Sequence, residues 1–204
     1  MYAGPDRGGG TWAVRTPGSA PGDRLRVVDS LRGQLLIAAP PLHDPNFQRT
    51  VVLVAEHSHE GALGVVLNRP SDLDVGEGAP ELCDLLDGDQ PVFVGGPVEP
   101  AGVLVLAEFE DVGEAAGVAL GDIGFLGPQR PASGLRRARV FAGHAGWAPE
   151  QLDAEVAAEG WILERALRAD IFCDEPERLW SAVLERKGGR YAMLTRMPLD
   201  PRVN

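Results

Sequence analysis

Short, continuous apolar runs dominate the first half of the chain. Residues 91–94 and 103–106 predict two further strands, and the three runs that carry the prediction of the sheet centre occupy residues 35–39, 51–55 and 63–67. Runs of this length that do not alternate with polar residues are typical of strands covered on both faces. The short link 57–61 joins the second run to the third and predicts an antiparallel pair. The sequence therefore predicts the centre of a sheet in this region.

The stretch 139–152 predicts a strand that turns into a helix, and the rest of the chain is organised around it. Gly143 and Gly146 permit backbone angles that other residues avoid, and Pro149 suits a first helical turn. The helix is expected over residues 149–159, buried through Leu152 and Val156 and ended by glycine 160. A strand at 161–165 follows.

The remaining elements are predicted from weaker patterns. A short helix is expected over 80–86, a strand around 118–120, and a loop over the glycine-rich residues 121–127. Asp174 and Glu177 form a capping-box pattern for a last helix that Gly188 ends. Residues 191–194 are expected to close the domain.

Domain organisation follows from a change in composition near residue 31. Residues 1–30 mix Gly, Pro and Arg without apolar periodicity, which predicts a disordered N-terminal extension. Residues 31–204 are expected to form a single domain. No apolar run has the length of a membrane span, and the start lacks a secretory signal, so we expect a cytoplasmic protein.

The charge balance excludes several classes of function. The chain has 19 basic and 30 acidic residues and a net charge of −11. Such an acidic protein repels a phosphate backbone, which argues against a DNA-binding module with a broad basic face. Lys187 is the only lysine and does not stand in a Walker-type phosphate loop. Cys83 and Cys173 have neither disulfide-framework nor zinc spacing.

Several motifs in a fixed order resemble one protein family. They are Gly33-Gln34-Leu35-Leu36-Ile37-Ala38, Asp44-Pro45-Asn46-Phe47, Glu60-Gly61-Ala62-Leu63-Gly64, Asn68-Arg69-Pro70, Gly95-Gly96-Pro97-Val98 and Ala145-Gly146-Trp147-Ala148-Pro149-x-Gln151-Leu152. Over residues 31–194 the chain resembles the AlgH family, bacterial proteins described as transcriptional regulators without an established biochemical activity. The resemblance implies an α+β fold, with a largely antiparallel, mixed sheet bent into a partial barrel and helices packed outside. The chain departs from the family pattern at His144 and over 108–133.

The two glycine turns suggest a candidate binding site. Backbone N–H groups at Gly95-Gly96 and Gly143–Trp147 could bind an anion if the two turns lie side by side. The candidate ligand-binding residues are Asn68, Gly95, Gly96, His144, Gly146 and Trp147. The competing interpretation, which we favour, is structural: glycines where strands bend, and Trp147 packed between sheet and helix.

Other reactive groups give weaker signals. His57 and His59 with Glu60 could begin a metal site, but a polar hairpin tip explains them better. The thiol of Cys173 stands beside Asp174, whose charge disfavours a thiolate. No serine stands in a Gly-x-Ser-x-Gly or Ser-x-x-Lys motif. We therefore expect no catalytic residue set, no metal and no cofactor.

Three functions remain after these exclusions. We expect a non-enzymatic regulatory or binding protein that recognises a small anionic ligand or a protein partner. The alternative is an enzyme that acts on a small phosphorylated or carboxylated metabolite in the glycine-turn cleft. A direct DNA-binding regulator is disfavoured, because the chain is acidic and has no recognisable helix-turn-helix.

Overall fold

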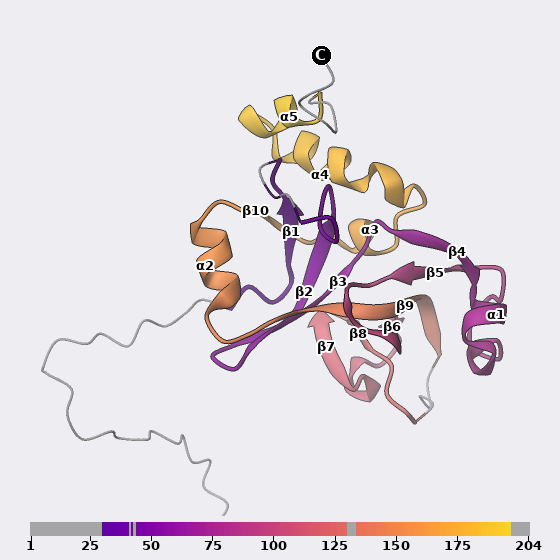
Figure 1. Ribbon diagram of the computed structural model, residues 1–204. Coiled ribbons are helices and arrows are strands. Elements are labelled where there is room, and N and C mark those ends of the chain that lie inside the picture. The colour runs from indigo at the N-terminus through magenta and orange to yellow at the C-terminus, as the bar shows by residue number, and fades with distance from the viewer. Residues whose placement is uncertain (1–29, 41, 43, 130–133, 197–204) are drawn as a thin grey trace, which may run out of the picture.

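The computed structural model describes residues 30–40, 42, 44–129 and 134–196. A bent ten-stranded sheet, antiparallel except for one pairing among these residues, carries helices on its outside (Figure 1). The sheet begins at β10 and ends at β7, so it is open, and the predicted α+β fold is confirmed. The expected N-terminal extension, apart from Ser30, lies outside the described residues. No helix in the described ranges is long and apolar enough to cross a membrane.

The elements follow one another with short connections. The strands are β1 Gln34–Ala38, β2 Val51–Ser58, β3 Gly61–Val66, β4 Pro70–Asp74, β5 Pro91–Val94, β6 Val98–Phe109, β7 Gly117–Leu120, β8 Ile123–Phe125, β9 Leu135–Trp147 and β10 Trp161–Arg165. The helices are α1 Val75–Gly78, α2 Gln151–Ala157, α3 Arg168–Ile171, α4 Leu179–Lys187 and α5 Arg190–Leu194. Strands pair in the order β10-β1-β2-β3-β9-β6-β8-β7, while β5 pairs with β9 and β4.

Both faces of the central strands are covered, as their continuous apolar runs predicted. In β1, Leu35 and Ile37 belong to the cluster that packs against α4. Leu36 and Ala38 point the other way, into the cluster that contains Trp161 of β10 and residues of α2. The predicted antiparallel hairpin of β2 and β3 is also confirmed. Burial on both faces explains why polar residues do not alternate with apolar ones here.

Strand β9 is flanked by β5 and β6 on opposite edges. Ala142 pairs with Val94 of β5 in parallel and with Val103 of β6 in antiparallel orientation. A strand has two hydrogen-bonding edges, so these partners lie on different sides of β9. The chain between β5 and β6 must therefore cross over β9, and it does so within residues 95–97.

The predicted loop over residues 121–127 is wrong, because this segment contains β8. Strand β8 pairs with both β6 and β7. A Cβ atom on Gly124 would lie 2.5 Å from the carbonyl oxygen of Gly117, so glycine permits the close approach of β7. The spacing of the glycines predicted a loop, whereas in the structure Gly124 allows β7 and β8 to pack closely together.

Helix starts and lengths account for the other differences. The proposed capping box at Asp174 and Glu177 does not form, because a 3₁₀ turn at Pro176–Arg178 precedes α4, whose N-cap is Arg178. The predicted helix 80–86 is reduced to a 3₁₀ turn at Pro80–Leu82 followed by further turns. Residues 191–194 belong to α5.

Glu155 fastens α2 to the sheet. One of its carboxylate oxygens accepts hydrogen bonds from the indole N–H of Trp147, at 3.0 Å, and from that of Trp161, at 2.8 Å. The two indoles pack edge to face with their ring centroids 6.2 Å apart, and Phe47 contacts both. Both tryptophans are buried, so their N–H groups need an acceptor inside the protein.

Replacing this acceptor is expected to destabilise the protein. The Glu155→Ala change leaves two buried indole N–H groups unpaired and should lower the free energy of unfolding by about 2–4 kcal/mol. Urea unfolding followed by tryptophan fluorescence measures the loss. Glu185→Ala, which removes an exposed carboxylate of α4, is the matched control and should stay within about 0.5 kcal/mol of the unmodified protein. Equal effects of the two changes would show that Glu155 does not hold α2.

Candidate functional site

The structure places the two glycine turns side by side, in direct backbone contact. Where residues 95–97 cross β9, a Cβ atom on Gly95 would lie 2.2 Å from the carbonyl oxygen of Gly143. One on Gly96 would lie 2.2 Å from the carbonyl carbon of His144. Gly143 adopts φ +69°, and its own Cβ would meet the carbonyl oxygen of Gly96 at 2.6 Å. Only glycine fits this crossing, because no side chain can enter between the two backbones.

Both backbone polar groups of Gly95 are engaged within the protein. The N–H of Gly95 donates to the carbonyl of Ala142 at 2.8 Å, and its carbonyl accepts from the N–H of Val66 at 2.9 Å. Gly95 thereby joins β9 to β3. Its N–H is not available to an anion, which removes one of the donors that the sequence suggested.

Asn68 and Trp147 have structural partners. The side-chain oxygen of Asn68 accepts from the N–H of Val51 at 2.8 Å, and its amide donates to the carbonyl of Arg49 at 2.9 Å. Asn68 thus fixes the chain that enters β2. Trp147 lies on the α2 side, 7% exposed, with its N–H bound to Glu155. Neither side chain turns toward the glycine crossing.

His144 and Gly146 lie at the open side of the crossing. His144 is half-buried and pairs with Val98 at the start of β6, and Gly146 is exposed. A Cβ atom on Gly146 would make only ordinary contacts, 3.5 Å from Val98 and 3.9 Å from the His144 ring. Four of the six candidate residues therefore come together, Gly95, Gly96, His144 and Gly146, and their role in ligand binding stays a prediction.

A different cluster of residues surrounds a cavity at the beginning of β5 and β9. This cluster was not predicted from the sequence. This cavity of about 490 Å³ is lined by Arg136, Arg137 and Arg139 of β9, together with residues of the β5 and α3–α4 regions. We call it the arginine pocket. Its other lining residues are Gln90, Pro91, Phe93, Ala138, Phe172, Cys173, Asp174 and Pro176. The signal in the sequence is three arginines within four positions of an acidic chain.

Arg139 is held firmly in the wall of the arginine pocket. Its guanidinium lies over the ring of Phe93, 4.2 Å from the centroid, and donates to the carbonyl oxygen of Cys173 at 2.7 Å. Burial lowers the pKa of Arg139 from its ordinary value, and the hydrogen bond to the Cys173 side chain opposes this shift. An arginine nevertheless keeps its proton, so the wall of the pocket carries a fixed positive charge.

The other two arginines differ in their partners. Arg136 faces Asp122 at 3.2 Å and Glu108 at 3.6 Å, and both carboxylates also bind Arg168. The hydrogen bond from Arg168 lowers the pKa of Asp122, so this carboxylate stays charged. The side chain of Arg137 is exposed and has no hydrogen-bond or ion-pair partner among the described residues. A ligand can therefore engage the exposed Arg137 without displacing a carboxylate.

Both ring nitrogens of His57, a residue of the weak metal-site hypothesis, have partners within the protein. Its Nδ1 accepts the backbone N–H of Leu31 at 3.0 Å, and its Nε2 lies 3.5 Å from a carboxylate oxygen of Asp153. The side chain is 3% exposed. Its two nitrogens therefore serve to join β2 to the chain before β1 and to α2.

Similarity to known proteins decides the family. A family model described as AlgH-like matches residues 35–192. The chain belongs to this AlgH-like family. A UPF0301 protein of Streptomyces coelicolor is 42% identical over 190 residues, which cover 88% of this chain and 98% of the relative. One from Thermobifida fusca is 42% identical over 197 residues, covering 89% and 98%.

Solved structures of the AlgH-like family agree with the fold. A crystal structure of a Corynebacterium diphtheriae protein superposes with a TM-score of 0.72 at 26% identity and covers 81% of this chain and 91% of its own. The solution structure of the AlgH protein from Pseudomonas aeruginosa gives 0.65 at 29% identity, covering 90% and 98%. These likenesses carry the fold and the family, and they assign no reaction.

The crossing predicts that alanine is far more destabilising at Gly95 than at Gly146. Gly95→Ala places a methyl group on the carbonyl of Gly143 and should lower the free energy of unfolding by about 3 kcal/mol or more. Gly146→Ala, where the space is open, should change it by less than about 1 kcal/mol. Thermal unfolding followed by circular dichroism compares the two variants. A Gly95→Ala variant as stable as Gly146→Ala would mean that the backbones do not touch.

Proposed function

We propose that this AlgH-like protein is a non-enzymatic binding protein that recognises a small phosphorylated or carboxylated compound in the arginine pocket. The observation that supports this is Arg137, an exposed guanidinium without a carboxylate partner among the described residues, beside the fixed guanidinium of Arg139. Guanidinium groups bind phosphate and carboxylate oxygens through paired N–H donors. Two of them in one cavity favour an anion with at least two oxygens.

The charge of the whole chain limits the size of this anion. With a net charge of −11, the protein repels a long polyanion such as a nucleic acid. At physiological salt the repulsion is screened beyond about 8 Å, so the nearby arginines dominate for a small ligand inside the pocket. Asp174 in the lining adds a local negative charge that disfavours deep binding of a highly charged group. A compound with one or two acidic groups fits these charges best.

Binding without conversion agrees better with the lining than catalysis does. Cys173 is the nucleophilic side chain in the lining, and its Sγ lies 3.9 Å from the Arg139 guanidinium. The lining contains no histidine to act as a general base, and Asp174 stands next to the thiol. We therefore propose that occupancy of the pocket is the signal, as in a regulatory protein. The enzyme that acts on such a metabolite remains the alternative.

Pyrophosphate and succinate are suitable probes for this proposal. Isothermal titration should show binding of at least one of them to the unmodified protein, and Arg137→Ala should weaken it about tenfold or more through loss of a charge-assisted contact. Arg165→Ala removes another exposed arginine, on β10, and should leave the affinity unchanged. Phosphorus NMR of the pyrophosphate mixture should show no turnover.

Three results would contradict the proposal. They are the absence of binding by both probes at millimolar concentration, equal weakening by Arg137→Ala and Arg165→Ala, and steady hydrolysis of pyrophosphate. The last result would favour the enzyme. Tight, salt-sensitive binding to duplex DNA that Arg137→Ala abolishes would favour the DNA-binding regulator instead.

A further inference from the structure

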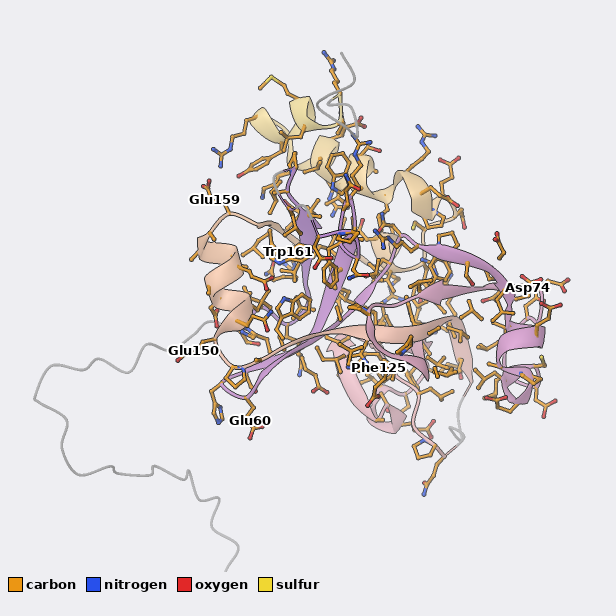
Figure 2. All side chains as sticks on the ribbon, viewed as in Figure 1. Glu60, Asp74, Phe125, Glu150, Glu159 and Trp161 are labelled. Carbon is orange, nitrogen blue, oxygen red and sulfur yellow. The ribbon has the colours of Figure 1, made fainter. Side chains whose placement is uncertain are left out.

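A second cavity, of about 810 Å³, lies at the β10 edge of the sheet, where α2, β10 and α5 meet. We call it the β10 groove. Its walls are mainly apolar and include Leu42, Val156, Ile162, Tyr191 and Leu194. Figure 2 shows Trp161 between α2 and the first strand, and Glu159 just beyond the end of α2. A volume of this order and apolar walls with a few polar groups are typical of sites for small organic ligands.

Strand β10 brings its free hydrogen-bonding edge to this groove. The N–H of Ala39 donates to Gly160 and the N–H of Ala166 donates to Gly33, which fixes the alternation of bonds between β1 and β10. In an antiparallel pair every second residue turns its N–H and C=O away from the partner. Here these residues are Trp161, Leu163 and Arg165. Since β10 ends the sheet, their peptide groups face outward.

Two of the three outward carbonyls of β10, those of Leu163 and Arg165, are bound by cations of α4. Lys187 donates from Nζ to the carbonyl of Leu163 at 2.8 Å, and Arg186 donates to that of Arg165 at 3.4 Å. Such capping is a known way to protect an edge strand from pairing with another chain. The outward N–H of Leu163 has no acceptor among the described residues. An added strand needs both the N–H and the C=O groups of β10, so the bound carbonyls exclude it. A ligand that supplies only a hydrogen-bond acceptor can still bind the N–H of Leu163.

Lys187 holds its charge at a fixed point of the groove. Its Nζ also lies 3.1 Å from a carboxylate oxygen of Glu164 and 5.1 Å from the centre of the Tyr191 ring. An ammonium group has three donors, and the hydrogen bonds to the Leu163 carbonyl and the Glu164 carboxylate use two of them. The N–H of Leu163 turns to the same outer edge as the Leu163 carbonyl that Lys187 binds. Arg190 stands farther along the lining, bound to the hydroxyl of Tyr191 at 3.0 Å, and Glu159 provides the opposing charge.

From this geometry we infer that the β10 groove binds a small amphipathic carboxylic acid. The carboxylate accepts from Lys187 Nζ and from the N–H of Leu163, and an aliphatic or aromatic body lies against Ile162 and Leu194. Because Glu164 already pairs with Lys187, the site carries little excess charge, so the head group alone or the apolar body alone binds weakly. The arginine pocket plays no part in this binding.

Octanoate tests the inference, with octanol and acetate as the separate halves of the ligand. In isothermal titration the unmodified protein should bind octanoate at least tenfold more tightly than octanol or acetate. Lys187→Met keeps the apolar stem, removes the charge and should weaken octanoate binding at least tenfold. Octanol that binds as tightly as octanoate would overturn the inference, because the carboxylate would then contribute nothing.

Two tryptophan substitutions at the end of α2, at its last residue Ala157 and at its C-cap Ala158, locate the site even if Lys187→Met fails to fold. Ala158 is exposed and lines the groove, so Ala158→Trp should abolish octanoate binding. Its neighbour Ala157 is exposed and does not line the groove, so Ala157→Trp should leave the affinity unchanged. Arg137→Ala should also have no effect. Equal effects of Ala157→Trp and Ala158→Trp would place the ligand elsewhere and overturn the inference.

The chain's own carboxyl-terminal segment is the competing occupant. It follows α5 in the sequence and contains Leu199 and Val203. A full-length variant with Leu199→Ser and Val203→Ser should bind octanoate with unchanged affinity if the groove serves a small ligand. Binding that becomes at least tenfold tighter would show that the segment fills the groove, and would overturn the assignment to a small carboxylic acid.

Discussion

The crossing of one backbone over another at β9 is the constraint on which the rest of the structure depends. Strands β5 and β6 are consecutive in the chain, yet they flank β9 on opposite edges. The chain must pass over β9 within three residues, and it can do so only where neither backbone carries a side chain. Gly95, Gly96 and Gly143 meet that condition. A sheet with this strand order would not form with larger residues there.

The same crossing determines where functional groups can gather. It holds β5 parallel to the middle of β9, so that the beginnings of both strands lie together and form the arginine pocket. Beyond the crossing, β9 pairs with β3 and leads into α2, which Glu155 ties back to the two indoles. The end of α2 and the strand that follows it then form two walls of the β10 groove. The elements that form both proposed sites are thus connected through β9.

Local sequence patterns were sufficient where burial alone decides the structure. The runs around Ile37 and Leu53 predicted strands covered on both faces, and the turn after Ser58 predicted a hairpin. Patterns failed where a distant partner decides the structure. Glycine spacing predicts a loop at Gly124, but Gly124 lies in a strand, and its close contact with Gly117 depends on strand pairing that the local sequence does not show. The start of α4 differs from the prediction for a local reason, since a 3₁₀ turn that begins at Pro176 takes the place of the expected cap. Six candidate site residues were chosen for their backbone freedom, whereas the arginine pocket depends on which cations lack a carboxylate, and only the fold shows that.

The central claim is that an anion binds where β5 and β9 begin and does not bind at the glycine crossing. A titration of the nitrogen-15-labelled protein with pyrophosphate, followed by two-dimensional NMR, tests it residue by residue. The account predicts the largest shifts at the amides of Arg137, Arg139 and Cys173, with Gly95, Gly96 and Gly146 nearly unchanged. Shifts that centre on the three glycines and His144 would contradict it and would return the ligand to the turns.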